Sequence, residues 1–374
     1  MSALREDWDV VRDLFPPDWE ELGRSTGAVT RLRGFDSLND LLRTLLLHVG
    51  CGWSLRETSV QAKLAGIANV SDVTLLNRLR QAEDWLRQLC QQLWKDNGVD
   101  LQPALQGRLF RLVDATTVKE PGKTGGQWRI HYSMRLPSLE CDHFDLTAVE
   151  GKDTGERLGR FQFHVGEVVL ADAGYSHVAG IGAVVDQGAD VCVRLNPHVL
   201  PLWSGQDSRF DVVKAVQTLH KAGDIAEWAV WVKTGKRRIA GRLCGIRKSE
   251  EAIFRAQRRI TRKAQKKGQD KPSEARKALA CYVLVFTTLS RKQATTQQVL
   301  NCYRLRWQIE LTFKRLKSIA QLGHVPKRDD QSSRAWLYGK LFVALLTQKL
   351  IRIGSTISPW GYLLPETAGK KPMA

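Results

Sequence analysis

The sequence predicts a mixed α/β protein in which an all-helical amino-terminal region precedes a region of alternating strands and helices. Two observations lead to this prediction. Up to about residue 105 the apolar residues recur at helical spacing, whereas short segments rich in β-branched and aromatic residues begin at residue 108. In this second region three strands are followed by helix, strand, helix and strand, which is typical of an α/β domain.

The charge of the chain indicates a polyanionic partner. Its 374 residues include 57 Lys and Arg but only 39 Asp and Glu, which gives a net charge of +18. Proteins this basic most often bind nucleic acid, because neutralising phosphates releases counterions. An anionic membrane surface or the ribosome is the alternative.

Cysteine usage and hydropathy predict a cytoplasmic protein with no membrane partner. The seven Cys residues are scattered and form no CxxC pair, which fits a reducing compartment and argues against a disulfide framework or structural zinc. The first residues lack the apolar core of a signal peptide. No apolar run approaches the roughly 20 residues that a membrane span needs.

In the helical region, the segment GIANVSD at residues 66–72 predicts a turn between two short helices. Ser71 or Asp72 can cap the second of these helices. The arrangement is compatible with a helix-turn-helix DNA reader, and it is equally compatible with an ordinary helical bundle. The basic residues that a DNA reader would use are Arg78, Arg80 and Arg87.

The α/β region continues through a β-rich and basic stretch into two long helices. The predicted elements are strands at 108–116, 128–136 and 141–151, a helix at 153–162, a strand at 167–172, a helix at 177–189, a strand at 189–197, antiparallel strands at 224–248, a strand at 279–289, one long helix at 295–322 and a final helix at 334–353. Residues 255–277 are dense in Lys and Arg. They form either a solvated helix face or loop, or a surface that contacts phosphates.

Three carboxylates are candidates for catalysis. Asp114 and Asp172 follow apolar strand patterns, and catalytic groups of α/β sheets collect at the carboxyl ends of strands. Each could instead start a turn or cap a helix. Together with Glu310, they can bind two divalent cations of the kind that prefers oxygen ligands. Such a pair can activate a water or a 3′-hydroxyl and stabilise the departing oxygen of a phosphodiester.

The predicted helix around Glu310 carries further polar groups on one face. Tyr303, Arg306 and Glu310 are spaced three and four residues apart, and Lys317 follows two turns later. This stripe can place one group on a metal ion and three on phosphates. Alternatively, Arg306 and Glu310 form an ordinary salt bridge on a solvated helix.

These residues resemble a known family. The pattern Y-x2-R-x3-E-x6-K at Tyr303, Arg306, Glu310 and Lys317 resembles the YREK signature of DDE transposases of insertion-sequence family four. The segments LVDAT and LADAGYS resemble the surroundings of the first and second catalytic Asp in that family. The likeness covers roughly residues 105–350.

The resemblance implies an RNase H-like (retroviral-integrase-like) catalytic core with a β-rich insertion. By this likeness Asp114, Asp172 and Glu310 hold two Mg²⁺ ions, for which Mn²⁺ can substitute. It further implies that DNA phosphates are contacted by Tyr303, Arg306 and Lys317, with Lys314 as a further candidate.

Some family members stack a flipped base on a tryptophan, an interaction worth about 1–3 kcal/mol. The candidates for this role are Trp203, Trp228, Trp231 and Trp307. Sheet packing is the alternative for Trp228 and Trp231, and packing in the core is the alternative to DNA contact for Trp307.

The resemblance also implies a domain plan and a function. The domains are expected to be a helical DNA-binding domain at 1–105, the catalytic core at 106–197 and 281–330, the insertion at 198–280 and a helical segment at 331–374. The expected function is cut-and-paste transposition, in which a homodimer in the bacterial cytoplasm, associated with the nucleoid, cleaves element-end inverted repeats and joins the 3′ ends to target DNA. The alternatives are an RNase H-like nuclease without strand transfer, and a catalytically silent DNA-binding repressor.

Overall fold

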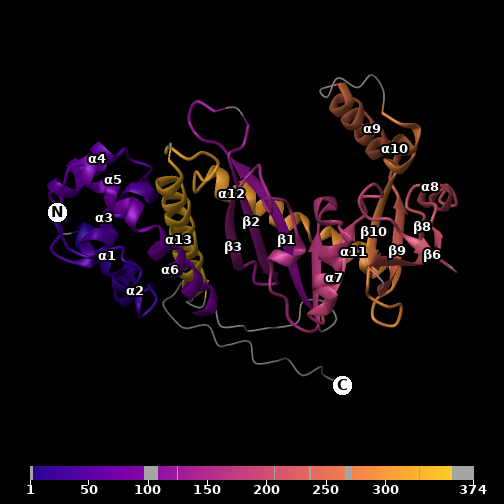
Figure 1. Cartoon of the computed structure of the whole chain (residues 1–374), viewed down its shortest axis with the longest axis horizontal. Coiled ribbons are helices and arrows are strands. Elements are labelled where there is room, and N and C mark those ends of the chain that lie inside the picture. Colours follow the sequence, from indigo (N-terminus) through magenta and orange to yellow (C-terminus); the bar gives the residue numbers. More distant parts are fainter. Residues whose placement is uncertain are drawn as a thin grey trace. The chain divides into compact units, whose positions relative to one another are not determined.

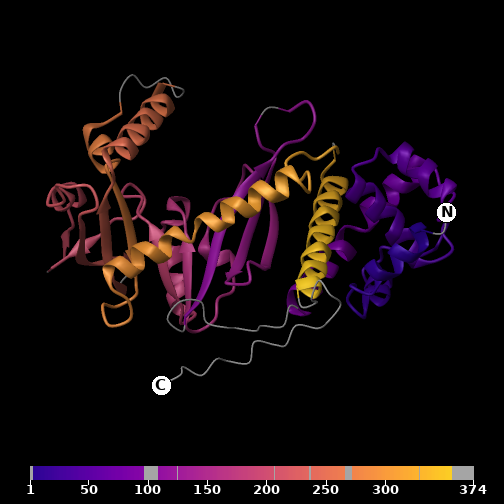
Figure 2. The same ribbon diagram turned by 180° about the vertical axis from the view of Figure 1, so that it is seen from behind.

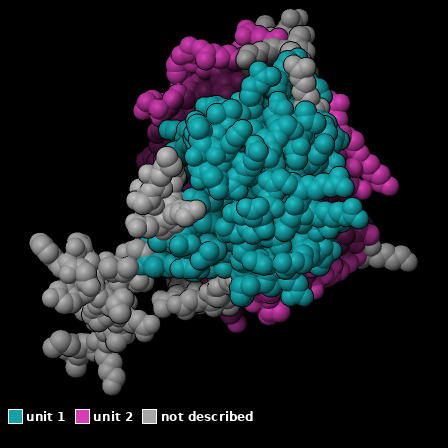
Figure 3. Space-filling model, turned by 90° about the vertical axis from the view of Figure 1, so that its left-hand side faces the viewer, with its two compact units in different colours: residues 1–99, 117–129, 313–374 teal, residues 100–116, 130–312 magenta. Residues whose placement is uncertain are grey.

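Helices dominate the amino-terminal third of the chain, and a large mixed sheet follows (Figure 1). The computed structural model describes residues 3–96, 108–123, 125–205, 207–235, 237–265, 272–327 and 329–355. The chain divides into two compact units, shown in Figure 3. Unit 1 comprises Met1–Val99, Thr117–Arg129 and Phe313–Ala374, and unit 2 comprises Asp100–Thr116 and Ile130–Thr312. The four-domain plan stays a prediction.

Unit 1 is built on helices, as the apolar periodicity predicts. They are α1 (Ala3–Arg12), α2 (Trp19–Ser25), α3 (Leu38–Cys51), α4 (Leu55–Leu64), α5 (Asp72–Gln81), α6 (Glu83–Asp96) and α13 (Asp330–Ser355). Helix α13 packs against α6 and α3. Trp85 of α6 is fully buried, stacks on Trp19 at 6.3 Å between ring centroids, and donates its indole N–H to the Trp19 carbonyl at 2.8 Å.

The turn between α4 and α5 is formed as predicted, with Ser71 as the N-cap that accepts a hydrogen bond from the Thr74 N–H. The basic residues near this turn are engaged within the protein. Arg78 donates to the Arg31 carbonyl, and Arg80 pairs with Asp329 at 3.0 Å. Arg87 of α6 likewise pairs with Asp84. Arg78 and Arg80 thus connect α5 to other segments of unit 1, whereas the Arg87 pair lies within α6.

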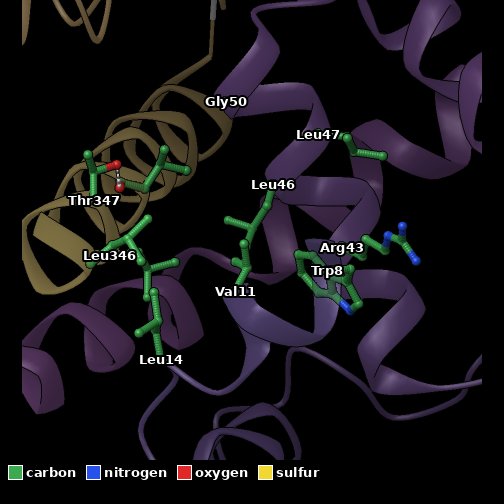
Figure 4. A pocket seen from close by; sticks show the side chains of 11 residues that line it. Trp8, Val11, Leu14, Arg43, Leu46, Leu47, Gly50, Leu346 and Thr347 are labelled. Carbon is green, nitrogen blue, oxygen red and sulfur yellow. Dashed lines mark hydrogen bonds between the residues drawn. The ribbon is translucent and has the colours of Figure 1, made fainter. Parts of the chain in front are cut away.

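An apolar groove of about 290 Å³ lies within unit 1 between α1, α3 and α13. Figure 4 shows Val11 and Leu14 of the α1 region facing Leu46 of α3 and Leu346 of α13. The Arg43 guanidinium lies over the Trp8 ring at 5.3 Å, so the charged group closes one side of the groove. Among the described residues, none of the helices combines the length and hydrophobicity that a bilayer-spanning segment needs.

One ten-stranded sheet contains the strands of the chain's described part, in the order β3-β2-β1-β4-β5-β10-β9-β8-β6-β7. Their bounds are β1 (Leu109–Val118), β2 (Trp128–Leu136), β3 (Cys141–Ala148), β4 (Glu167–Ala171), β5 (Asp190–Arg194), β6 (Trp203–Ser204), β7 (Ser208–Arg209), β8 (Ile225–Thr234), β9 (Arg237–Arg247) and β10 (Tyr282–Thr287). Strands β1, β4 and β5 are parallel to their neighbours in this set, whereas β10, β9, β8, β6 and β7 pair in antiparallel fashion. The boundary between the two units passes through β1 and β2.

Strand β10 connects the two halves of this sheet. It pairs with β5 on one side and with β9 on the other, although about ninety residues of sequence separate it from β5. Gly241 of β9 allows this close packing, because a Cβ there would lie 2.5 Å from the ring of Phe286. The strands predicted at 224–248 therefore extend the same sheet as β4 and β5.

The helices of unit 2 lie on and beside this sheet. They are η1 (Leu158–Arg160), η2 (Ala173–Tyr175), α7 (Val178–Asp186), α8 (Val212–Val216), α9 (Glu250–Gln265), α10 (Glu274–Leu279), α11 (Thr296–Arg304) and α12 (Trp307–Ser318), the last of which continues into unit 1. Figure 2 shows α11 crossing the sheet, where it packs against β5, β8, β9 and β10. The helix predicted at 153–162 is wrong, since only the short η1 forms there. The glycines at 155 and 159 weaken helical propensity in this segment.

The long helix predicted at 295–322 is also wrong, because it is divided into α11 and α12. Thr295 begins α11 with a capping box to Gln298. At the junction, the N–H groups of Leu305 and Arg306 bond to carbonyls three residues earlier rather than four. This tighter turn ends α11, and α12 starts at Trp307.

A buried ionic network connects β1, β2 and β3 to the start of β4. Arg111 of β1 pairs with Asp142 of β3 at 2.9 Å and with Glu167 of β4 at 3.2 Å, and Arg135 of β2 pairs with Asp142 at 2.9 Å. The Arg111 guanidinium also lies over the Phe163 ring at 5.2 Å. Because a buried charge is stable only when it is paired, this network fixes four strands relative to one another.

Candidate active site

Asp114 and Asp172 lie side by side on adjacent parallel strands. The register between β1 and β4 runs from Leu109 opposite Glu167 to Val113 opposite Ala171. Asp114 directly follows Val113, and Asp172 directly follows Ala171, so the two aspartates come at the same level of the two strands. Asp172 directly follows β4, as predicted. Asp114 differs from the prediction because β1 continues to Val118, although its pairing with β4 ends at Val113. Neighbouring strands are about 4.8 Å apart, which brings the two carboxylates to one place on the sheet.

Arg306 connects the first of these carboxylates to Glu310. One guanidinium nitrogen donates to Asp114 Oδ2 at 3.4 Å, and another donates to Glu310 Oε1. The salt bridge expected from the spacing of Arg306 and Glu310 is thus present, and it extends to β1. The structure therefore brings a strand residue and a helix residue together through one cation, although 192 positions separate Asp114 from Arg306.

The pKa of Asp114 is set by burial and by the charged groups around it. Burial raises the pKa of Asp114 to about 7, and the charges of Asp172 and Glu156 act in the same direction. The N–H of Ala115, which donates to Asp114 at 2.8 Å, and the guanidinium of Arg306 oppose this rise in pKa. A positive charge delivered to this place would therefore stabilise the ionised form of Asp114.

Tyr303 lies beneath Arg306. The guanidinium carbon is 6.0 Å from the centroid of the Tyr303 ring, a distance at which a cation is attracted to an aromatic face. Burial raises the pKa of Tyr303, so its hydroxyl stays protonated. Burial also opposes the charge of Arg306, yet Tyr303, Glu310 and Asp172 together raise the pKa of Arg306. The tight turn between α11 and α12 places these two side chains next to each other.

Glu156 is a site residue that the sequence analysis missed. A Cβ placed on Gly174 would lie 1.7 Å from a carboxylate oxygen of Glu156, so this carboxylate occupies the space beside the backbone that follows Asp172. Glu156 precedes η1 and lines an open pocket of about 810 Å³ together with Arg157 and His177. The glycine two positions after Asp172 is the signal that could have found this approach, because glycine permits close contact with a backbone.

The remaining predicted DNA contacts do not all belong to this cluster. Trp307 is 57% exposed, so it does not pack in the core, and its ring is available at the start of α12. Lys314 and Lys317 belong to unit 1. Lys314 is exposed, whereas Lys317 donates from Nζ to the Thr117 carbonyl at 3.1 Å, and burial lowers the pKa of Lys317.

The candidate tryptophans of the sheet divide into two kinds. Trp203 and Trp231 stack on each other at 5.6 Å between centroids, with Lys233 over the first ring and Arg238 over the second. Trp228 instead packs against the core of unit 2, as the sheet-packing alternative predicts.

The donor set fits a divalent cation, although the carboxylates are not gathered around a common point. Within the described ranges, no three His, Cys, Asp or Glu side chains converge closely enough to hold a metal ion. Arg306 instead occupies the position between Asp114 and Glu310. Carboxylate oxygens are the ligands that Mg²⁺ prefers. Burial is the main cause of the raised pKa of Asp114, and the charge of Arg306 offsets it only in part.

Comparison with known proteins identifies the family of this chain. Residues 150–346 match the family model described as the transposase DDE domain. The chain is 32% identical to the InsL transposase of insertion sequence element IS186A from Escherichia coli (strain K12), over 94% of this chain and 96% of that protein. It is equally similar to the transposase of IS421 from Escherichia coli, with the same identity and coverage.

A more distant relative is the transposase of IS231C from Bacillus thuringiensis subsp. berliner, with 23% identity over 90% of this chain and 78% of that protein. Since the family model covers more than half of the chain and the Escherichia coli relatives match nearly all of it, the resemblance seen in the sequence is confirmed. The chain belongs to the DDE transposase family.

Proposed function

We propose that this DNA transposase moves its element by a cut-and-paste reaction, with Asp114, Asp172 and Glu310 as its catalytic carboxylates. The observation that carries the proposal is how Asp114, Asp172 and Glu310 are linked within unit 2. Asp114 and Asp172 occupy equivalent positions on paired parallel strands, and Arg306 ties Asp114 to Glu310. In a protein of net charge +18, these neighbouring carboxylates can bind metal cations, which the surrounding Lys and Arg side chains cannot do.

We further propose that the catalytic core is RNase H-like. The strand order β3-β2-β1-β4-β5, with β1, β4 and β5 parallel, supports this assignment. The strands β6 to β9 then belong to an insertion between β5 and β10. In this arrangement the first and second aspartates lie on the central strands, and the glutamate is supplied by a helix that follows the insertion.

Asp114, Asp172 and Glu310 would hold two Mg²⁺ ions, for which Mn²⁺ can substitute. Bound there, the ions would activate a water or a 3′-hydroxyl and stabilise the departing oxygen of the phosphodiester. The Glu156 carboxylate lies beside the backbone of Gly174, two residues after Asp172, so we include it as a candidate for orienting a water near the ions. Carboxylate oxygens accept the hydrogen bonds of such a water.

The cations of the site would grip the DNA backbone. Arg306 pairs with Asp114 and Glu310 in the DNA-free protein, and its planar guanidinium suits bidentate contact with a phosphate. Tyr303 supports Arg306 from below, and the exposed Trp307 presents an indole ring on which a base can stack. Lys314 and Lys317 are proposed to contact phosphates of the same DNA end. The reaction requires two ends, so a homodimer would assemble with them on the nucleoid DNA of the cytoplasm.

A strand-transfer assay tests the proposal. The substrate is a pre-cleaved DNA end that carries the inverted repeat found next to the reading frame, together with a supercoiled target plasmid and Mg²⁺. The wild-type protein is expected to join the 3′-hydroxyl to the plasmid. Glu310→Gln should abolish joining while it leaves DNA affinity unchanged. Glu274→Gln, whose side chain is 87% exposed on α10, is the matched control and should retain full activity.

The outcomes separate the three functions. Hydrolysis without joining would support an RNase H-like nuclease. DNA binding without any nicking over a full Mg²⁺ titration would support a silent repressor. Loss of DNA binding in Glu310→Gln would assign a structural role to the carboxylate and would contradict the proposal.

A further inference from the structure

Helix α9 presents a face of arginines to solvent. Arg255, Arg258, Arg259 and Arg262 are exposed, and their spacing of three, four and seven residues places them on one side of the helix. The opposite side carries Ile253 and Ala264, which are buried. Helix α9 thus packs against the protein with one side, and its arginine side is accessible to a binding partner.

Most of these arginines lack an acidic partner. Arg255 pairs with Glu251 at 3.3 Å, but both side chains are largely exposed, and such pairs are worth little. For the other three, no carboxylate lies within 4 Å among the residues that the structure describes. The Arg258 guanidinium lies 5.5 Å from the centroid of Phe254, a ring that is 60% exposed. An exposed aromatic ring under an arginine adds an apolar surface next to the positive one.

The positive charge continues inward from α9 to the catalytic helix. Lys248, which follows β9, donates from Nζ to the Ala280 carbonyl at 2.5 Å. Both Arg194 and Lys248 lie next to β10, since Arg194 is opposite Val285 and the Lys248 N–H donates to the Cys281 carbonyl at 2.9 Å. Burial, and then the charges of Arg194 and Arg259, lower the pKa of Lys248 to about 8. Arg194 is the last residue of β5, and it also acts on Tyr303, where it opposes the rise in pKa that burial causes.

Like charges are costly to gather unless an anion joins them. Neither Arg194 nor Lys248 has a carboxylate within 4 Å among the described residues, although both are only partly exposed. The cations therefore form a path within unit 2 that begins beside Tyr303, passes Arg194 and Lys248, and ends on the arginine face of α9. The backbone of a DNA strand carries a matching row of negative charges, with one phosphate for every nucleotide.

We propose that this path is a binding track for the sugar-phosphate backbone of the element-end DNA, extending from the catalytic site to α9. The track consists of Arg194, Lys248, Arg255, Arg258, Arg259 and Arg262. This inference rests on the proposed function and adds a DNA contact surface to it. The arginine face alone spans about 10 Å of helix, enough to meet more than one phosphate. Its guanidinium groups suit phosphate better than ammonium groups do.

The test compares two fourfold variants of the full chain with equal change in charge. The track variant is R255Q/R258Q/R259Q/R262Q. The control is K214Q/K221Q/R237Q/K292Q, whose residues are exposed in unit 2 but lie outside the track. DNA affinity is measured against salt concentration for duplexes that lengthen stepwise on either side of the cleavage position. Urea unfolding confirms that both variants are folded.

The track variant is expected to reduce the slope of log affinity against log salt by up to about 3 to 4, since each phosphate contact contributes about 0.9. This loss should appear only once the duplex exceeds a certain length, because shorter DNA does not reach α9. The control should retain the wild-type slope at every length. An equal reduction in both variants, or a reduction already present with the shortest duplex, would overturn the proposal and leave a solvated helix face.

A second measurement locates the DNA directly. A photo-crosslinking amino acid at position 254 should attach to a defined nucleotide of the end DNA, whereas the same amino acid at position 214 should not. Crosslinking from both positions, or from neither, would contradict the track. Failure of the proposed function can be distinguished from failure of the track, because both measurements report DNA binding alone. If the wild-type protein binds DNA through the track but never joins ends, the proposed transposition reaction is contradicted and the proposed track is not.

Discussion

Strand β1 carries two ionic clusters whose first members, Arg111 and Asp114, are three residues apart, and they differ in how completely their charges are matched. At Arg111, two guanidinium groups meet the carboxylates of Asp142 and Glu167, and the Arg111, Asp142 and Glu167 side chains are less than 10% exposed. At Asp114, a single guanidinium serves several carboxylates, and the Glu310 side chain is 46% exposed.

This difference fits a structural role for the first cluster and the proposed catalytic role for the second. Balanced charges in a dry interior hold strands in place and have no further capacity to bind. The second cluster keeps an excess of negative charge that the protein does not neutralise, and burial makes that excess unfavourable for Asp114. The unbalanced cluster therefore suits the role proposed for it, in which cations bind and the chemistry takes place.

The largest expected effect comes from neutralising the unbalanced cluster. Asp114→Asn and Asp172→Asn should each reduce DNA cleavage by at least about 10²- to 10³-fold, as loss of a preorganised electrostatic group does in other active sites. Single-turnover cleavage of end DNA with Mg²⁺ is the measurement. Near-normal rates in either variant would erase the distinction between the two clusters.

Neutralising the balanced cluster should instead affect stability. Asp142→Asn leaves Arg111 and Arg135 without a shared carboxylate, and breaking a buried pair costs about 3–5 kcal/mol. The free energy of unfolding in urea measures this effect. Asp114→Asn is the matched control. It should unfold at the same or a higher urea concentration, because it removes a carboxylate whose burial is unfavourable.

A smaller effect is expected at Arg306, which competes with metal ions for the same carboxylates. In the absence of DNA, Arg306→Gln should tighten Mn²⁺ binding by no more than about fivefold, because a partly exposed ion pair is worth about 0–1 kcal/mol. Calorimetric titration with Mn²⁺ provides the affinity. Weaker Mn²⁺ binding in this variant would mean that the guanidinium organises the site rather than competing for it.

The smallest effect concerns Lys248. Among the described residues, its positive charge is not matched by a nearby carboxylate, just as the negative charge around Asp114 is not fully matched by cations. Burial, Arg194 and Arg259 lower the pKa of Lys248 to about 8, so its charge is present below that pH and lost above it. DNA binding should therefore weaken as pH rises from 7 to 9, with a salt slope that falls by at most about 0.9. Lys248→Arg keeps its charge over this range and should flatten the pH response. A response that is unchanged in the Arg variant would assign the titration to another group.

Much of the fold could be predicted from the sequence, because apolar periodicity and turn residues report local structure. The strand before Asp172 and the helix around Glu310 were predicted in this way, and the family resemblance selected the same carboxylates. The contribution of Glu156 was not visible, because it depends on a loop that passes Gly174. The division of the long helix was not visible either, since neither Gly nor Pro marks the junction before Arg306.

The position of β10 has a consequence for how the protein is made. Strand β5 ends at Arg194 and pairs with β4 on one edge, but its other edge is paired only when Thr287 and its neighbours have been synthesised. At translation rates of about 5–20 residues per second, the edge of β5 waits roughly 5 to 20 s. During this interval the nascent chain has an open strand edge that favours association with chaperones or aggregation. The proposed catalytic residue Glu310 follows later still, so the ribosome has finished most of the chain before this carboxylate can join Asp114 and Asp172.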